Sequence, residues 1–294
     1  MSRRVSIVYN PISGKNRGES AARETARILE RNGFGECSLF ESQGDDHLEQ
    51  LGERASLDSD VIVAVGGDGT LNHVVNGMRN REIPVGLVPC GTGNAVAQEF
   101  RVGRTPAEAA RTISNGHIRT IDAIRVGGVL SLMMVGAGIE GDVDARMHKR
   151  RDGHYMSIWS YLPMFVSSLV RWRAPRMNIY VDGRLVADWA DEVIVANIAH
   201  HGGPFTVAPG AKPDDGLLDV WVFQCGRPDA IVRMLLAVMF RMHRDSRCVK
   251  RYSARRVTID SPGPVPYHVD GDPGGVTPLE ATIEPKAFRL FARR

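Results

Sequence analysis

Short runs of β-branched residues alternate with helical patterns over the first part of the chain, and this rhythm restricts the fold more than any other feature. Runs such as "VSIVY" (5–9) and "DVIVAV" (60–65) are mostly apolar, as is typical of buried strands. Strands that alternate with helices favour a parallel sheet covered by its crossover helices. We therefore expect strands at 5–9, 37–40, 60–65 and 83–89, and helices at 19–33, 45–56, 70–78 and 105–116.

The pattern changes after Asp122. Turn signals predict a hairpin around Gly127-Gly128 and another within 177–198, and apolar helical stretches occupy 155–172 and 228–242. Further short strands are expected at 217–223, 255–260, 267–272, 279–284 and 287–291. The sequence thus predicts an α/β protein of two domains, with an N-terminal parallel α/β domain over 1–122 and a C-terminal, mainly antiparallel β domain with apolar helices over 123–285.

Composition indicates an ordinary globular protein. The 294 residues are 43% hydrophobic and 24% charged, and a net charge of +3 is too small to indicate nucleic acid as a partner. Four cysteines without CxxC spacing favour a reducing compartment. The N-terminus lacks the apolar core of a signal peptide, and the longest uncharged stretch (153–170) contains His154 and Pro163, which makes it weak as a spanning helix. We expect a cytoplasmic protein.

Three glycine-marked loops follow predicted strands of the first domain: "YNPISGKNRG" (9–18), "GGDGTLN" (66–72) and "PCGTGNAVA" (89–97). In a parallel sheet these loops lie at the carboxyl edge, where ligands of such sheets bind. Glycines let backbone N–H groups approach an anion, and helix N-termini add their dipole. The side chains expected to fix a polyphosphate and its metal are Asn10, Ser13, Asp68, Thr70, Asn72, Thr92 and Asn94.

Each loop taken alone is explained equally well as a strand-to-helix turn with a polar cap, because short motifs often match by chance. Three of them on successive strand ends indicate a binding site. The familiar nucleotide signatures are absent. "ISGKN" lacks the spacing of the P-loop, since Tyr9 stands in place of its first glycine, and "CGTGNAV" has Val96 at the third glycine of GxGxxG.

The second domain supplies acidic residues. In "YHVDGDP" (267–273), His268, Asp270 and Asp272 share one face if the segment is extended, and two neighbouring carboxylates suit general-base chemistry. The alternative is a hairpin turn, which the Asp-Gly spacing alone favours. "APGAKPDDGLLDV" (208–220) has the clustered acids of a hard-cation site, although a plain surface loop explains it as well.

Two segments join apolar helical faces to clusters of Arg and Lys: "FVSSLVRWRAPR" and "IVRMLLAVMFRMHRDSRCVKR". This mixture suits a membrane surface or an acyl-chain cleft. A buried helix with a solvated basic end is the alternative, and the pattern alone favours it.

Taken together and in this order, "NPISGKNRG", "GGDGTLN", "PCGTGNAVA", "PGAKPDDGLLDV" and "VDGD" resemble the diacylglycerol kinase catalytic-domain family, specifically its soluble bacterial lipid kinases related to sphingosine kinases. The resemblance covers nearly the whole chain. It implies a nucleotide-binding α/β domain and a β-rich lipid-substrate domain, with ATP and Mg²⁺ in the cleft between them. It also implies that a C-terminal segment, here 286–294, returns to the first domain.

The resemblance also implies roles for individual residues. The phosphate loop is Gly66, Gly67, Asp68, Gly69, Thr70 and Asn72, flanked by Asn10, Thr92, Gly93 and Asn94 as further nucleotide contacts. A structural metal falls to Asp215 with the carbonyls of Leu217 and Lys212. Asp270 and Asp272 match the family's catalytic acids, with Asp272 one methylene shorter than the usual Glu. "VGAGIEGDVDA" matches a substrate-side element only loosely, because Glu140 and Gly141 replace its usual residues.

The sequence therefore predicts transfer of the ATP γ-phosphoryl group to a lipid hydroxyl, with amides at 66–70 on the phosphates, Asp68 near Mg²⁺, and Asp270 or Asp272 as the base. The expected partner is a lipid at the inner face of a membrane, a homodimer is left open, and no nucleic acid is expected. Two alternatives remain: an NAD kinase-like activity on a soluble nucleotide, and a non-catalytic protein that senses nucleotides or lipids.

Overall fold

The computed structural model describes residues 3–142, 175–202 and 205–294. The chain divides into two compact units, one formed by Met1–Ala123 with Pro285–Arg294 and the other by Ile124–Glu284. The apolar helix expected at 155–172 lies outside the described residues.

A parallel sheet forms the centre of the first unit, as the alternating pattern predicts. Its strands run in the order β2-β1-β3-β4, and Val5 pairs with Cys37 on one side and Val61 on the other. The strands β1, β3 and β4 are buried along their whole length, which explains why they lack polar alternation. The bounds are β1 (Val5–Tyr9), β2 (Cys37–Glu41), β3 (Val61–Gly66) and β4 (Val85–Pro89).

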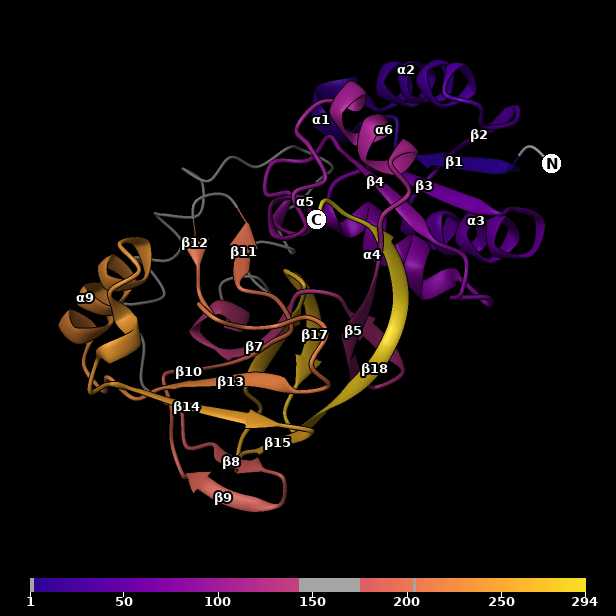
Figure 1. Ribbon diagram of the computed structural model, residues 1–294. Helices are drawn as coiled ribbons and strands as arrows, with labels where there is room; N and C mark the ends of the chain where they lie inside the picture. Colours follow the sequence, from indigo (N-terminus) through magenta and orange to yellow (C-terminus); the bar gives the residue numbers. More distant parts are fainter. Residues whose placement is uncertain (1–2, 143–174, 203–204) are drawn as a thin grey trace. The chain divides into compact units, whose positions relative to one another are not determined.

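Helices cover both faces of this sheet, with α2 and α6 over one face and α3 and α4 over the other (Figure 1). The apolar residues of α2 recur every three or four positions, so Ala22, Ala26 and Leu29 are buried against the strands. α3 and α4 approach so closely that a side chain at Gly52 or Gly77 would meet the backbone of the other helix. The bounds are α2 (Gly18–Arg31), α3 (Asp45–Asp58), α4 (Asp68–Gly77) and α6 (Pro106–Ser114).

Two short helices were not expected from the sequence: α1 (Ser13–Asn16) and α5 (Ala95–Glu99). Both follow glycine loops and are too short to show a helical period. Thr105 caps α6 by accepting the Glu108 amide, with Pro106 at the first helical position as predicted. The start of α4 is two residues earlier than expected, because Asp68 and Gly69 already belong to its first turn.

The second unit is built from antiparallel strands, which confirms the predicted change of fold type. One sheet has the order β14-β13-β10-β7-β16-β17, and in the other the antiparallel series β18-β15-β8-β9 is joined by the β5–β6 hairpin beside β18. The pair β11 and β12 forms a separate ribbon. Two strands pass between the units: β5 (Ile118–Val126) begins in the first unit, and β18 (Leu279–Phe291) ends in it. The other bounds are β6 (Val129–Ser131), β7 (Met134–Gly138), β8 (Asn178–Val181), β9 (Arg184–Ala187), β10 (Glu192–Ala196), β11 (His200–Gly202), β12 (Phe205–Thr206), β13 (Leu218–Phe223), β14 (Val249–Ala254), β15 (Arg256–Asp260), β16 (Pro266–Val269) and β17 (Asp272–Val276).

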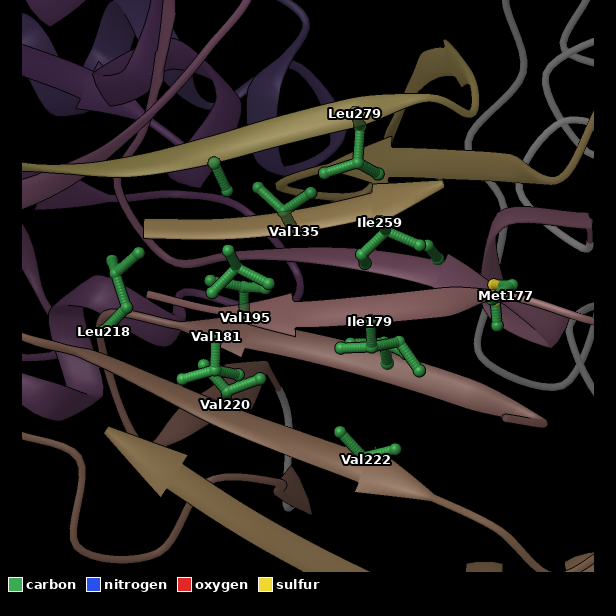
Figure 2. Close-up of a cluster of buried hydrophobic side chains, with 14 of the residues drawn as sticks. Val135, Met177, Ile179, Val181, Val195, Leu218, Val220, Val222, Ile259 and Leu279 are labelled. Atoms are coloured by element: carbon green, nitrogen blue, oxygen red, sulfur yellow. The ribbon is translucent and has the colours of Figure 1, made fainter. Parts of the chain in front are cut away.

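Apolar side chains from the two sheets of this unit form its core (Figure 2). Alternate residues of β13 point inward, so Leu218, Val220 and Val222 lie in the core. They pack with Ile179 from β8 and Ile259 from β15, which belong to the other sheet. The unit is therefore a two-layer β structure, to which the apolar helix α9 (Pro228–Met239) and a 3₁₀ turn (His243–Asp245) are added.

The predicted hairpins at Gly127-Gly128 and within 177–198 are confirmed by the pairs β5–β6 and β8–β9. Two other expectations are wrong. The strands expected at 279–284 and 287–291 are one strand, β18, because the chain stays extended through Pro285 and absorbs the irregularity at Lys286, whose φ is 54°. The segment 267–272 is not one strand but a hairpin that turns at Asp270 and Gly271.

Candidate functional site

The three glycine loops of the first unit touch one another at the carboxyl ends of β1, β3 and β4, as the sequence predicts. A Cβ atom on Gly91 would lie 2.7 Å from the Cα of Gly67, so two of the loops are in backbone contact. A Cβ atom on Gly14, whose φ is 62°, would similarly collide with the carbonyl oxygen of Cys90. Only glycine fits at these positions, and the loops form one continuous backbone surface.

The N-terminus of α4 opens directly onto this surface. Gly67 is the N-cap residue and provides no side-chain cap, and a Cβ on Gly69 would meet nothing within 4 Å. The first-turn amides of a helix have no carbonyl partner within the helix and favour an anion. The side chain of Thr70 is buried beneath Gly66, so only its backbone faces this region. Open space beside Gly69 fits a phosphate group better than it fits a packed turn.

Asp68 joins two of the loops. Its carboxylate oxygens accept hydrogen bonds from the amides of Ala95 at 2.9 Å and Val96 at 3.0 Å, which are the first residues of α5. A carboxylate at a helix N-terminus is stabilised by the helix dipole. Asp68 therefore holds the loop after β4 against the loop after β3, and its expected place beside a metal ion stays a prediction.

Asn94 presents a hydrogen-bond acceptor in the same region. Its φ of 46° is left-handed, and its amide nitrogen donates to the Gly91 carbonyl at 2.7 Å. Its Oδ1 atom is buried and has no hydrogen-bond partner among the described residues. A buried acceptor without a donor is costly, so it indicates a position where a ligand hydroxyl or a coordinated water donates.

The other residues expected to contact a nucleotide lie around these loops in different environments. Asn10 is half-buried and accepts the Ile12 amide through Oδ1 at 3.2 Å, which leaves its amide nitrogen as the donor. Thr92 is exposed, and the carbonyl of Gly93 accepts from the Gln98 side chain at 2.7 Å. Asn72 accepts from Asn76 one turn later on α4. The glycine surface, the helix end and these polar groups together present backbone donors and open space suited to an anionic group such as a phosphate.

The segment expected to hold a structural metal is a loop of the second unit. Asp215 is exposed, and its Oδ1 accepts the Leu217 amide at 3.1 Å. Asp219, which sequence reasoning did not include, lies close enough for Asp215 to raise its pKa in addition to the effect of burial, and it accepts the Lys212 amide. No group of three or more His, Cys, Asp or Glu side chains suited to a metal occurs in the described ranges. A cation here would depend on backbone carbonyls and water as well as carboxylates, and such a donor set fits Mg²⁺ or Ca²⁺.

The two acids of "VDGD" have different environments. Asp270 has a φ of 53° in the turn between β16 and β17, so the two carboxylates do not share a strand face as the extended interpretation required. The carboxylate of Asp270 accepts hydrogen bonds from the Ser131 hydroxyl at 2.6 Å and from the amides of Leu132, Met133 and Met134 at 2.7–3.0 Å. Asp272 is the first residue of β17 and is exposed. The carboxylate of Asp270 therefore anchors the turn through hydrogen bonds, whereas Asp272 is exposed.

Sequence reasoning did not connect Glu140 with His268, although the structure places their side chains 3.3 Å apart. The two residues are 128 positions apart in the chain, and only the pairing of β7 with β16 brings them together. No local pattern could have indicated this contact.

Two family models match the chain over nearly its whole length. The diacylglycerol kinase catalytic domain matches residues 4–126, and the YegS C-terminal NAD kinase beta sandwich-like domain matches residues 133–292.

Known proteins are similar to this chain over nearly its whole length. Diacylglycerol kinase from Mycobacterium tuberculosis is 26% identical over 99% of this chain and 96% of its own length, and diacylglycerol kinase from Bacillus subtilis is 25% identical over 95% and 92%. The crystal structure of a diacylglycerol kinase from Bacillus anthracis has the same fold, with a TM-score of 0.78, 21% identity, and coverage of 99% of this chain and 97% of that one. This chain belongs to the diacylglycerol kinase catalytic-domain family.

Proposed function

We propose that the protein is an ATP-dependent lipid kinase, which transfers the γ-phosphoryl group of ATP to a hydroxyl of diacylglycerol or a related lipid. The observation that carries the proposal is the joined glycine surface at the N-terminus of α4, in a chain of the diacylglycerol kinase family. The named relatives are diacylglycerol kinases, which supports a lipid as the acceptor.

In this proposal the first unit binds the nucleotide. The amides at the start of α4 contact phosphate oxygens, Gly69 leaves room for them, and Asn94 accepts from the nucleotide or its hydration shell. Asp68 keeps the two loops in register through its bonds to α5. When bound, ATP supplies the phosphoryl group, and a divalent cation such as Mg²⁺ neutralises the charge that develops on it.

The second unit supplies the base, and the geometry favours Asp272 over Asp270. Four donors already engage the carboxylate of Asp270, so this side chain acts as a structural anchor of the turn. Asp272 is exposed at the end of the same turn, where a lipid hydroxyl can reach it. A carboxylate in this position accepts the hydroxyl proton as the phosphoryl group is transferred.

We further propose that α9 docks onto an anionic bilayer. Ile231 and Met234 face the protein, whereas the rest of the helix and its continuation expose a row of apolar side chains: Val232, Leu235, Leu236, Met239, Phe240 and Met242. Exposed arginines at 241, 244 and 247 follow directly, and arginine beside an apolar helix face is complementary to anionic lipid headgroups. No helix in the described part of the chain is long and apolar enough to cross a membrane.

The test is a transfer assay with γ-labelled ATP, a panel of hydroxyl lipids in mixed micelles, and NAD as a soluble acceptor. Label in a lipid product, and its loss in Asp272→Asn, supports the proposal. The C-terminal family model is described as NAD kinase beta sandwich-like, and this likeness makes a soluble nucleotide the second candidate acceptor. Label only in the soluble product would overturn the lipid assignment, and nucleotide binding without any labelled product would indicate a sensing protein.

A further inference from the structure

A buried histidine connects the acidic turn to the interior of the second unit. His268 lies on β16 with a fully buried side chain, opposite Gly136 on β7. A side chain at Gly136 would collide with the imidazole, so the glycine provides the space that the ring occupies. An imidazole placed in a sheet interior has to satisfy both ring nitrogens, because an unpaired buried polar atom is costly.

Both nitrogens of His268 have partners, and together they define its tautomer. The amide of Gly271 donates to Nδ1 at 3.2 Å, so Nδ1 carries no proton. Nε2 lies 3.3 Å from Oε2 of Glu140 and donates to it. His268 is therefore neutral, with its proton on Nε2, and protonation at Nδ1 would set two donors against each other.

Glu140 is itself held in place. Its own amide donates to Oε2 of Glu192 at 2.8 Å, and Nε2 of His201 lies 3.9 Å from its carboxylate. Burial raises the pKa of the Glu140 carboxyl, but the neighbouring imidazoles of His201 and His268 outweigh this effect and hold the pKa well below its usual value. The carboxylate thus stays ionised and keeps the imidazole oriented.

The amide that His268 binds belongs to the peptide between Asp270 and Gly271, one residue before Asp272. Asp270 and Gly271 have φ values of 53° and 90°, as in the tight turns that connect two strands. The Asp270 carboxylate fixes one side of this turn to residues 131–134. His268 fixes the amide of Gly271, the residue directly before Asp272. Without the hydrogen bond to His268, the Gly271 peptide is free to rotate.

We propose that His268, oriented by Glu140, is a positioning residue that fixes the Gly271 peptide and through it the carboxylate of Asp272. This inference rests on the proposed function, because it assigns His268 a role through the proposed base. A histidine that only filled space would act equally through either nitrogen. A positioning residue depends on the acceptor at Nδ1.

Two isosteric variants separate these possibilities. In His268→Asn the side-chain oxygen takes the place of Nδ1 and keeps the Gly271 bond, whereas in His268→Gln the amide nitrogen takes the place of Nε2 and keeps only the Glu140 bond. We expect kcat of His268→Asn to stay within a few-fold of wild type. We expect His268→Gln to lose about 100-fold in kcat with KM for ATP unchanged, the loss typical of a reacting group displaced by an ångström. Equal losses in both variants, or no loss in either, would overturn the proposal.

Two further measurements keep the proposal testable if the variants are unstable. In wild-type protein the Gly271 amide should exchange slowly with solvent although the turn is exposed, and fast exchange would refute the bond to His268. In an Asp272→Asn background, His268→Gln should cause no further loss of kcat, because it acts through Asp272. An additional loss would overturn the assignment. If wild type labels only a soluble acceptor, the lipid proposal fails, yet the Asn and Gln variants can still be compared on that product.

Discussion

Replacement of Asp270 by alanine tests whether this acid is structural. The substitution removes the acceptor for the Ser131 hydroxyl and for three consecutive amides, at distances of 2.6–3.0 Å. Each hydrogen bond to a charged group contributes about 1.5–3 kcal/mol, and water can replace part of that loss because Asp270 is only half-buried. We therefore expect the free energy of unfolding to fall by about 3–5 kcal/mol, the range for breaking a buried charged network.

The asparagine variant refines this expectation. Oδ1 of Asp270 accepts from Ser131, Met133 and Met134, whereas Oδ2 accepts from the Leu132 amide. In Asp270→Asn the oxygen can keep the first three bonds, and the new NH₂ group faces the Leu132 amide as donor against donor. One such mismatch costs about 1–3 kcal/mol, so this variant should lie between alanine and wild type.

Urea unfolding followed by tryptophan fluorescence is a suitable assay, because all four tryptophans lie within Ile124–Glu284. Asp272→Asn is the matched control: it removes a neighbouring carboxylate that is exposed, and it should change stability by less than about 0.5 kcal/mol while lowering kcat severely to a small residual rate. If Asp270→Ala is as stable as wild type, or if Asp272→Asn is the more destabilised of the two, the assignment of structural and chemical roles is wrong.

Three further outcomes are expected. The double variant Leu236→Asp with Phe240→Asp should abolish cosedimentation with vesicles that contain phosphatidylglycerol. The control variant Leu185→Asp, at a similarly exposed apolar position on β9, should still cosediment. Concentration-dependent dimerisation without vesicle binding would instead show that a second copy of the chain covers the apolar face of α9. Burial raises the pKa of Glu140, but the His201 and His268 imidazoles lower it below its usual value, so the ionised carboxylate contributes stability at neutral pH that is lost as the pH falls through the lowered pKa. The free energies of unfolding of Glu140→Gln and wild type in urea should therefore differ at pH 7 and converge in acid, and a constant difference would contradict this. Burial raises the pKa of the Cys37 thiol to about 11, so at pH 7 Cys37 should react with a thiol reagent far more slowly in the folded protein than in the unfolded chain. Mass spectrometry can follow the labelling, and rapid labelling of the folded protein would show that the thiol is accessible.

The fold was predictable where its signals are local. The apolar runs of β1 and β3 and the three-to-four spacing in α2 are visible within single segments, and the structure has these elements within a few residues of the expected bounds. The short helices α1 and α5 escaped prediction because α1 contains left-handed residues, α5 begins after the left-handed Asn94, and both are too short to show a period. The continuity of β18 through Pro285 also escaped, since proline usually marks the end of a strand.

The candidate site was predictable to the extent that topology alone determines it. Parallel strands place their carboxyl ends together, and this rule correctly brought the glycine loops into contact. The hydrogen-bond partners of the acids were not predictable, because Asp68 and Asp270 bind backbone amides, which every residue type presents. Likewise, the contact between Glu140 and His268 depends on strand register, which the sequence does not determine over 128 residues.

Asp68 and Asp270 share a chemistry that sequence motifs do not reveal. Both lie next to a glycine, both are within motifs expected to react or to bind metal, and both use their carboxylates to hold two loops together through amides. A carboxylate with amide partners is stabilised as an anion and is a weaker proton acceptor for substrate. The glycine beside each acid lets the backbone come close, so the "DG" pair is as suited to anchoring a loop as to catalysis. Exposure separates the two uses, and by this criterion Asp272 is the acid of the turn to which we assign the chemical role in the proposed function.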